Sequence, residues 1–304
     1  MITTEGLTRR FGTVTAVDAV TLEIPDGEVF GLLGPNGAGK TTTLRMLAGL
    51  IGVTEGRAEV DGLDVRDPAS AALIRARLGL LPEEPGLYPD LTVRGTLEFF
   101  ARLHHVRDRA TRVNGLLDRL SLTDRADARV ATLSKGLKQR LALARALVND
   151  PSIVFLDEPT ANLDPAASQE VRAIILELRG KGCTVVLNTH RLEEVERTCD
   201  RVGILQTRLL AIAEPRSLRR RLGSAPAVIG LERIDPSLVE AVAQALRTSV
   251  EVQESSLRVS LAEDRTMADV VQAVVHAGGR VTSAQVDEGT LEEAYLEVLN
   301  DAIH

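Results

Sequence analysis

The sequence predicts an α/β fold built around a parallel sheet, followed by a small α+β domain. Three observations predict this class. Short hydrophobic strands alternate with helices over residues 31–82 and 152–213, a glycine-rich loop joins one strand to one helix, and the recognisable motifs stop at about residue 225. Strands that alternate with helices pair in parallel, because each helix carries the chain back to the same edge of the sheet.

The N-terminal segment, residues 1 to about 30, alternates short strands with turns, including Asp26-Gly27. The buried strand expected at residues 28–33 then opens the parallel core.

The loop at residues 34–41 (GPNGAGKT) follows that strand and leads into a helix expected over residues 40–50, the setting of a phosphate-binding loop. Glycines let backbone amides turn toward a phosphate, and the helix N-terminus adds partial positive charge. Lys40 would place a full charge on the β- and γ-phosphates, and Thr41 would place its hydroxyl on a bridging magnesium ion. The candidate nucleotide-binding residues in this region are Gly34, Asn36, Gly37, Ala38, Gly39, Lys40, Thr41 and Thr42. The alternative is a glycine-rich turn that binds nothing.

The segment at residues 153–159 (IVFLDEP) is a buried strand that ends in two consecutive acids. Open parallel sheets gather ligands at the carboxyl ends of their strands. Asp157 is therefore a candidate magnesium ligand, and Glu158 is a candidate general base that orients and deprotonates an attacking water. The alternative makes the two acids a helix N-cap and its solvated neighbour.

Residues 133–140 (LSKGLKQR) open an apolar helix that Ser134 can cap. Together with the two segments above, this one resembles the signature of the ATP-binding cassette (ABC) ATPases, a branch of the P-loop NTPases. The resemblance implies ATP and Mg²⁺ as cofactors, with the N-terminal antiparallel layer cradling the adenine. It also implies two nucleotides sandwiched between two subunits. Ser134 and Gly136 would then meet the γ-phosphate held by a second copy of the chain or by a related ATPase subunit.

Three further residues fall where the same resemblance expects them. Asp164, in residues 161–165 (ANLDP), resembles the segment that reaches across the dimer toward the opposing site. His190, after the strand expected at residues 184–187, resembles the switch histidine that hydrogen-bonds the γ-phosphate, although a histidine at a strand end is often structural. Phe11 matches the aromatic residue that stacks on adenine, with core packing as its alternative.

Glu83 departs from the family pattern. It follows the strand expected at residues 77–81 and Pro82, where most members carry a glutamine that touches the metal and the water. A carboxylate can still bind magnesium, so Glu83 is a candidate catalytic residue and metal ligand, but it adds negative charge beside the γ-phosphate. The signature also has Leu137 and Lys138 in place of the more frequent pair of glutamines, which leaves Ser134 and Gly136 intact.

The motifs divide the chain into an ABC ATPase domain over residues 1–222 and an accessory domain over residues 225–304, joined by a linker at residues 223–226 (GSAP). Periodic apolar residues predict a helical subdomain at about residues 87–149, inserted into the first domain. The helical positions that carry this periodicity are Leu97, Phe100, Leu103, Leu116, Leu117 and Leu120.

The second domain is expected to follow the order βαββαβ with an added helix, which is the order of a ferredoxin-like unit. The expected strands are 228–231, 250–253, 257–261 and 280–286, and the expected helices are 236–246, 267–277 and 291–299. Its acidic ending, residues 287–296 (DEGTLEEAYL), resembles the tail of ATPase subunits in multidrug-type and ABC-2 type export systems.

Composition limits the location and the partners. Among the 304 residues no apolar run approaches the roughly 18–20 needed to cross a bilayer, and no basic stretch followed by an apolar one begins the chain. We therefore expect a cytoplasmic protein, peripheral on the inner face of the cell membrane through its membrane partner. The net charge of −7 argues against a nucleic-acid partner. Cys183 and Cys199 lack metal-ligand spacing and are expected to be reduced and structural.

These patterns predict the ATP-binding and ATP-hydrolysing subunit of an ABC transporter, an exporter with separate membrane subunits. In transporters of this family the helical subdomain docks a helix of the membrane subunit. Leu87, Tyr88 and Leu91 are candidates for that contact, with core packing as the alternative. A soluble ABC ATPase acting on DNA or ribosomes is a second hypothesis, but such proteins usually carry coiled coils, zinc-binding cysteines or two cassettes. A regulatory ATP-binding module with little turnover is a third.

Overall fold

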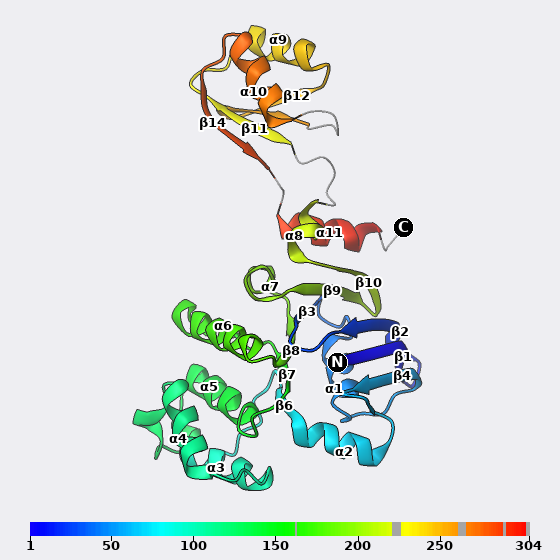
Figure 1. Cartoon of the computed structure of the whole chain (residues 1–304), viewed down its shortest axis with the longest axis vertical. Coiled ribbons are helices and arrows are strands. Elements are labelled where there is room, and N and C mark those ends of the chain that lie inside the picture. Colours follow the sequence, from blue (N-terminus) through cyan, green and yellow to red (C-terminus); the bar gives the residue numbers. More distant parts are fainter. Residues whose placement is uncertain (162, 221–225, 261–265, 288–289, 302–304) are drawn as a thin grey trace. The chain divides into compact units, whose positions relative to one another are not determined.

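The computed structural model describes residues 1–161, 163–220, 226–260, 266–287 and 290–301. The chain divides into two units, Met1–Pro215 and Arg216–His304 (Figure 1). The elements of the first unit are β1 (Ile2–Phe11), β2 (Val14–Ile24), β3 (Val29–Leu33), α1 (Lys40–Leu47), β4 (Glu55–Val60), β5 (Leu63–Asp64), α2 (Pro68–Arg77), β6 (Leu78–Leu81), α3 (Val93–Leu103), α4 (Arg109–Arg119), α5 (Lys135–Ala146), β7 (Ile153–Asp157), α6 (Pro165–Gly180), β8 (Thr184–Thr189), α7 (Leu192–Thr198), β9 (Arg201–Gln206) and β10 (Arg208–Ala213). After α8 (Pro215–Arg220), the second unit contains β11 (Ala227–Leu231), α9 (Pro236–Leu246), β12 (Val250–Gln253), β13 (Ser256–Val259), α10 (Met267–His276), β14 (Val281–Val286) and α11 (Leu291–Asp301).

The core of the first unit is a six-stranded sheet in the order β10-β9-β3-β8-β7-β6. All pairs are parallel except β10 with β9. Every residue of β3, β7 and β8 is buried, because both faces of a parallel sheet are covered. These strands are largely apolar, and their buried polar residues are Asp157, Thr184, Asn188 and Thr189. The register places Asp157 beside Asn188 and Leu33 beside Thr189, so the carboxyl ends of β3, β7 and β8 meet at one edge.

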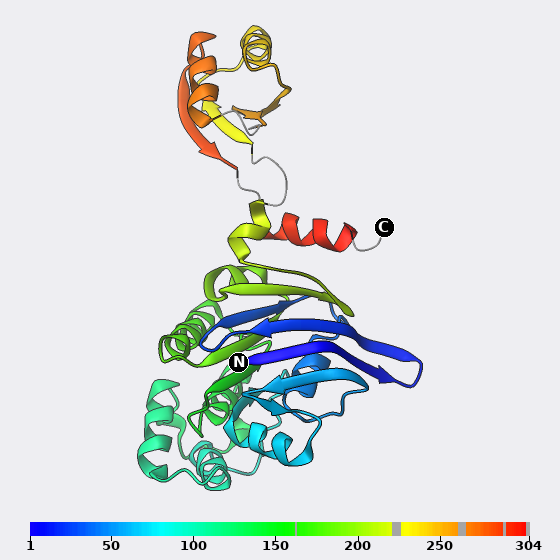
Figure 2. The ribbon, with the colours of Figure 1, turned by 45° about the vertical axis from the view of Figure 1, so that its right-hand side comes forward.

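A second, antiparallel sheet runs in the order β2-β1-β4-β5, and its long strands β1 and β2 are seen in Figure 2. Helix α1 lies between this sheet and the core sheet, and the predicted N-terminal β layer is confirmed. The side chains that fill the space between the two sheets include Ile2, Leu7, Phe30, Leu32, Met46 and Phe155, all at most 2% exposed.

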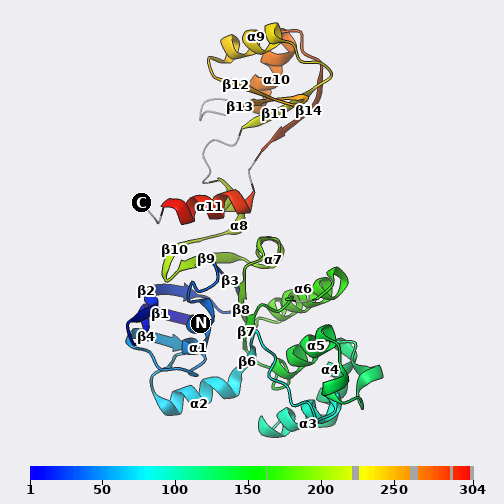
Figure 3. The same ribbon diagram turned by 180° about the vertical axis from the view of Figure 1, so that it is seen from behind.

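Helices α3, α4 and α5 lie on the other side of the core sheet, away from the antiparallel layer (Figure 3). Their apolar faces share one core with β7 and β8, which includes Leu97, Leu116, Leu141 and Leu156. The helices begin at Thr92, Asp108 and Ser134, whose side chains each accept a hydrogen bond from the backbone three residues on. Helices in this region were predicted, but Leu103, at the end of α3, is 59% exposed and lies outside the core.

The second unit is built on a four-stranded antiparallel sheet in the order β12-β13-β11-β14. Helices α9 and α10 supply apolar residues to the core over this sheet, including Leu238, Val242, Val270 and Val274 against Ile229 and Leu257. Each predicted element of this region is present, with ends that differ by at most two residues. Predicted features that lie outside the described residues are Asn162, residues 223–225 of the linker, Leu261, Glu288 and Gly289. In the part of the chain that the structure describes, no helix is both long and apolar enough to cross a membrane.

Candidate functional site

The glycine-rich loop connects β3 to α1 at the edge where the core strands end. Gly39 has a φ of +96°, a left-handed conformation that favours glycine. A Cβ atom there would lie 2.3 Å from the carbonyl oxygen of Ala16, and one at Gly34 would lie 2.1 Å from that of Leu205. Both glycines are therefore required by close backbone approach, and the predicted strand, loop and helix are confirmed.

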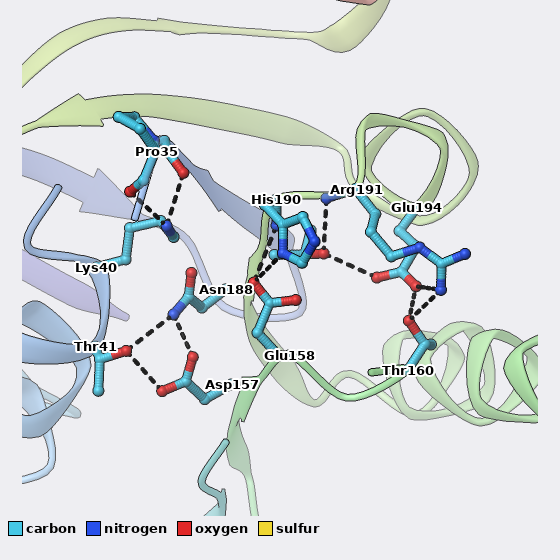
Figure 4. Close-up of polar contacts among 12 residues, drawn as sticks. Pro35, Lys40, Thr41, Asp157, Glu158, Thr160, Asn188, His190, Arg191 and Glu194 are labelled. Carbon is cyan, nitrogen blue, oxygen red and sulfur yellow. Dashed lines mark hydrogen bonds and ion pairs between the residues drawn. The ribbon is translucent and has the colours of Figure 1, made fainter. Parts of the chain in front are cut away.

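Lys40, the first residue of α1, is 7% exposed and folds back over the loop (Figure 4). Its Nζ donates to the carbonyl oxygens of Gly34, at 2.7 Å, and Pro35, at 3.0 Å. Burial lowers the pKa of Lys40, and the nearby carboxylates of Glu158, Asp157 and Glu83 oppose that effect. The ammonium group thus lies among acids at the site, held by two neutral carbonyls that an anionic ligand can replace.

Thr41, Asp157 and Asn188 form a polar cluster beside Lys40. Thr41 Oγ1 donates to Asp157 Oδ2 at 2.9 Å, and Asn188 Nδ2 donates to Asp157 Oδ1 and, at 3.4 Å, to Thr41 Oγ1. Burial raises the pKa of Asp157, the two hydrogen bonds oppose this, and the charges of Glu83 and Glu158 raise it further. A bound cation would relieve the repulsion among these acids.

Glu158 directly follows β7 and has a left-handed backbone, with φ of +49°. Its N–H donates to the carbonyl of Asn188 at 2.8 Å, which ties it to β8. Its Oε1 accepts from the His190 backbone N–H at 3.1 Å and lies 2.7 Å from His190 Nδ1. Glu158 Oε2 is buried and has no partner among the described residues, so one carboxylate oxygen remains for another ligand.

These residues surround a cavity of about 490 Å³. It is lined by Phe11, Ala16, Asn36, Gly37, Ala38, Gly39, Lys40, Thr41, Thr42, Glu83, Asp157, Glu158 and Asn188. Phe11 is 47% exposed, and the guanidinium of Arg9 lies 4.4 Å from its ring centroid. Phe11 is therefore not a core residue, and its ring is available at the cavity.

Five predicted site residues do not line this cavity: Gly34, Ser134, Gly136, Asp164 and His190. Gly34 and His190 contact the lining residues Lys40 and Glu158, whereas the other three do not. Ser134 caps α5 by accepting from the Leu137 N–H at 3.3 Å, and Asp164 caps α6 by accepting from the Ala167 N–H at 2.8 Å. Both are exposed, and Gly136 is half-buried in the first turn of α5. Ser134 capping was predicted from sequence and is confirmed, whereas one chain alone does not bring these residues to its own cavity.

Sequence reasoning did not single out Ala16 and Asn188, which line the cavity, or Glu194, which hydrogen-bonds to residues next to the Glu158–His190 pair. Asn188 was seen only as part of a strand end, although a buried amide beside an acid is a signal of a polar site. Glu194, an acid in α7 that is 2% exposed, was not singled out. Its only signal in the sequence is its place five residues after Thr189, and that spacing does not reveal burial.

The acids and hydroxyl of the site fit a hard cation, which prefers oxygen ligands. No group of three or more His, Cys, Asp or Glu side chains with the arrangement of a metal site occurs among the residues described. Magnesium is ordinarily bound by one or two carboxylates together with substrate phosphates and water, so this chain need not supply a full set of ligands. The unpaired buried oxygens Glu158 Oε2 and Asn188 Oδ1 also fit a site that is completed by a ligand.

Comparison with known proteins finds a family model described as "ABC transporter" over residues 17–161. The chain is 37% identical over 312 residues to the daunorubicin resistance ATP-binding protein DrrA3 of Streptomyces coeruleorubidus, covering 99% of this chain and 96% of that protein. It is 43% identical over 213 residues to the Nod factor export ATP-binding protein I of Paraburkholderia xenovorans (strain LB400), covering 69% of each.

Solved structures with the same fold are ATP-binding cassettes. One is a dimeric post-hydrolysis state of the cassette MJ0796 bound to ADP and Pi, with a TM-score of 0.66, 27% identity, and coverage of 70% of this chain and 98% of that one. Another, an ATP-binding subunit of an ABC transporter, has a TM-score of 0.68 and 29% identity, with coverage of 73% and 93%.

Proposed function

The chain belongs to the ABC transporter family as one of its ATP-binding, ATP-hydrolysing subunits, and we propose that the cavity at the carboxyl ends of β3, β7 and β8 is where it hydrolyses ATP. The observation that carries this assignment is the convergence of Lys40, the Thr41–Asp157 pair and the Glu158–His190 pair on one cavity. The nucleotide would stack its adenine on Phe11 and lay its phosphates along the glycine-rich loop.

The phosphate end of the cavity is where charge is concentrated. Lys40 would exchange the carbonyls of Gly34 and Pro35 for the β- and γ-phosphates, while the loop amides donate to the same oxygens. Thr41 and Asp157, with Glu83 close by, would hold Mg²⁺, which when bound neutralises charge on the β- and γ-phosphates. The chain's own task at this end is to bind and orient the triphosphate.

Glu158 is the residue placed to take a proton from the attacking water. Its Oε2 has no hydrogen-bond partner among the described residues, and its Oε1 accepts a hydrogen bond from the His190 N–H. His190 is exposed on its other side, so its ring can also donate to the γ-phosphate. The side-chain amide of Asn188 donates to Asp157 and keeps Asp157 oriented while Glu158 accepts the proton.

A second ATPase subunit would complete each site. Ser134 and Asp164 are exposed helix caps that find no partner at this chain's own cavity, and Gly136 sits beside Ser134. We propose that they meet the γ-phosphate held by a second copy of the chain or by a related ATPase subunit. The dimeric state of a related cassette supports this arrangement.

The membrane subunit would dock on the helical region. Tyr88 is 51% exposed and packs edge-on to Phe99, with ring centroids 5.9 Å apart. A neighbouring cavity of about 240 Å³ is lined by Leu80, Phe100 and Arg145, among others. Leu87 packs against the core, which makes Tyr88 and this cavity the better candidates for contact. Such contact would place the protein on the inner face of the membrane, and the names of its relatives support export.

The C-terminal region is proposed to be a ferredoxin-like domain over residues 225–304, after an ATPase domain over residues 1–222. The strand order β12-β13-β11-β14, with every pair antiparallel, supports this assignment because a βαββαβ chain folds into that order.

The proposed site is tested with Glu158→Gln, Lys40→Ala and the unchanged full-length chain. We expect Glu158→Gln to bind ATP normally and hydrolyse it roughly 10²- to 10⁴-fold more slowly, the usual contribution of a general base. Lys40→Ala should lose binding of a fluorescent ATP analogue. Used as bait in detergent-solubilised native membranes, Glu158→Gln should capture an integral membrane protein that Lys40→Ala does not. Capture of ribosomes or DNA-bound proteins in its place would move the protein to the soluble branch of the family.

A further inference from the structure

The carboxylate of Glu194 joins the two chain segments that carry the Glu158–His190 pair (Figure 4). Its Oε1 accepts a hydrogen bond from Thr160 Oγ1, and its Oε2 accepts one from Thr189 Oγ1 at 3.1 Å. Thr160 lies two residues after Glu158, and Thr189 immediately precedes His190. One buried side chain therefore ties the segment after β7 to the end of β8.

Arg191 completes the network from the other side. Its Nη1 donates to Thr160 Oγ1 at 3.2 Å and lies 3.5 Å from Glu194 Oε1, and its backbone N–H donates to Thr189 Oγ1 at 3.1 Å. Each threonine hydroxyl thus donates to Glu194 and accepts from Arg191. Each of the two hydroxyls has both a hydrogen-bond donor and an acceptor as partner. A fully satisfied network of this kind holds the segment after β7 and the end of β8 in one arrangement.

Burying an acid at this position is unfavourable for folding alone. Glu194 is 2% exposed, and burial raises its pKa, while Thr189 and Arg191 oppose that rise. A buried carboxylate generally stabilises a fold no better than an apolar side chain of similar size. The network therefore calls for a role other than stability.

The backbone at Glu158 needs external support. Its φ of +49° is uncommon for a residue with a side chain, and such conformations persist where surrounding contacts determine them. The contacts that determine it are the Asn188 carbonyl on one side and, two residues later, Thr160 with Glu194 on the other.

We propose that Glu194 is a positioning residue for ATP hydrolysis, which holds Glu158 and His190 at their working separation through Thr160 and Thr189. Glu194 does not line the nucleotide cavity, so we place its effect in these two threonine contacts and not in a contact with the nucleotide. The inference rests on the proposed roles of Glu158 and His190 in hydrolysis.

The principal test compares Glu194→Gln with two matched controls in the full-length chain. Glu193→Gln removes an exposed carboxylate from the same helix, and Glu28→Gln removes a buried carboxylate paired with Arg201 at 2.8 Å, away from the cavity. We expect Glu194→Gln to lower kcat about 10- to 100-fold, the effect of a misplacement near 1 Å, and to leave KM and ATP affinity within about twofold. Both controls should keep kcat. The inference is overturned if Glu194→Gln keeps kcat, or if Glu28→Gln loses kcat as much for an equal loss of Tm.

The threonines give a second test that does not alter the acid. Thr160→Val and Thr189→Val remove a hydroxyl at nearly constant volume, whereas Thr160→Ser and Thr189→Ser retain it. The valine variants should lose kcat as Glu194→Gln does, and the serine variants should retain most of it. Glu194→Gln combined with Thr189→Val should cost little more than either alone, since residues of one network are not additive. If Glu194→Gln does not fold, the valine and serine pairs decide: equal kcat in both pairs overturns the inference.

Failure of the inference is distinguishable from failure of the proposed site. If Glu158→Gln hydrolyses ATP as fast as the unchanged chain, the proposed roles at the site are wrong. If Glu158→Gln is inactive while Glu194→Gln and the valine variants are active, the site stands and only the role of Glu194 is rejected.

Discussion

At the residue scale, the site is a set of acids held close together by burial and by one another. Asp157, Glu158 and Glu83 all line the cavity that Lys40 enters, and the charges of Glu83 and Glu158 raise the pKa of Asp157. The folded chain therefore carries unfavourable charge that a nucleotide and its cation would relieve. Two substitutions measure the effect of this unfavourable charge on cation binding and on stability.

Glu83→Gln should change how hydrolysis depends on magnesium. Removing this carboxylate leaves fewer anionic oxygens for the cation, so we expect half-maximal activity at roughly three to ten times more magnesium. ATPase rates over a magnesium titration at saturating ATP provide the measurement, with Glu84→Gln next to it as the control. Superimposable titrations of Glu83→Gln and the unchanged chain would show that Glu83 does not contribute to cation binding.

Asp157→Asn should stabilise the chain without ligands and abolish hydrolysis. A raised pKa means that the folded chain holds the Asp157 proton more tightly than the unfolded chain does. Stability therefore falls as pH rises from the ordinary pKa of 3.8 through the raised pKa of the folded chain. Asparagine carries no such charge, so its Tm at pH 7, without magnesium and nucleotide, should exceed that of the unchanged chain by roughly 2 °C or more.

The control for this effect is acid pH. Near pH 3 the two proteins should differ much less in Tm, because this pH lies below the ordinary pKa of 3.8 and Asp157 is then largely protonated in both the folded and the unfolded chain. A constant difference in Tm from pH 3 to pH 7 would contradict the assignment of the effect to the Asp157 charge.

At the element scale, the residues that cap helix N-termini stabilise their helices, and one of them is also proposed to bind a phosphate. Ser134 and Asp108 each accept a hydrogen bond from the backbone three residues on, and so cap α5 and α4. By capping alone the two residues are equivalent, but only Ser134 is proposed to meet a phosphate.

Ser134→Ala and Asp108→Ala should therefore separate capping from catalysis. Each should lower the free energy of unfolding by about 0.5–2 kcal/mol, the usual cost of a lost cap. Only Ser134→Ala should also lower kcat, by tenfold or more. Urea unfolding and ATPase assays on both variants provide the measurement, and equal rates in the two would refute a phosphate contact at Ser134.

Most elements were predictable because their periodicity and their ends are local. The strand, loop and helix around residues 34–41 and the cap at Ser134 follow from short-range sequence. Short-range sequence does not predict the Asp157–Asn188 and Glu194–Thr160 contacts. They join residues 31 and 34 positions apart and depend on the register of β7 with β8. Nor does sequence show that Phe11 is exposed, because an aromatic residue in a strand is equally typical of a core.

At the scale of the whole molecule, the cavity of one chain holds half of the proposed site. Lys40 and Glu158 line it, whereas Ser134 and Asp164 point to solvent as caps of α5 and α6. A composite site predicts that two defective chains can repair each other.

Lys40→Ala and Ser134→Ala should each be nearly inactive, yet an equal mixture should recover activity. A mixed dimer pairs the intact Lys40 of one chain with the intact Ser134 of the other, which restores one site in two. Random pairing makes half of the dimers mixed, so roughly a quarter of the unchanged rate is expected if the sites are independent. A mixture of Lys40→Ala with Glu158→Gln is the control. Both residues line the cavity of their own chain, so each site of a mixed dimer carries one of the two defects and no recovery is expected. Absence of recovery with Ser134→Ala would argue against shared sites.

Arg145 connects the C-terminal end of α5 to two other parts of the domain. Ser134 stands at one end of this 12-residue helix, roughly 18 Å from the other end at 1.5 Å per residue. At that far end Arg145 Nη1 donates to the carbonyls of Pro85, at 2.7 Å, and Gly86, at 3.3 Å, just beyond Glu83, and its guanidinium lies over the ring of Phe100. The contacts of Arg145 therefore connect the helix that Ser134 caps both to the loop that follows Glu83 and to Phe100.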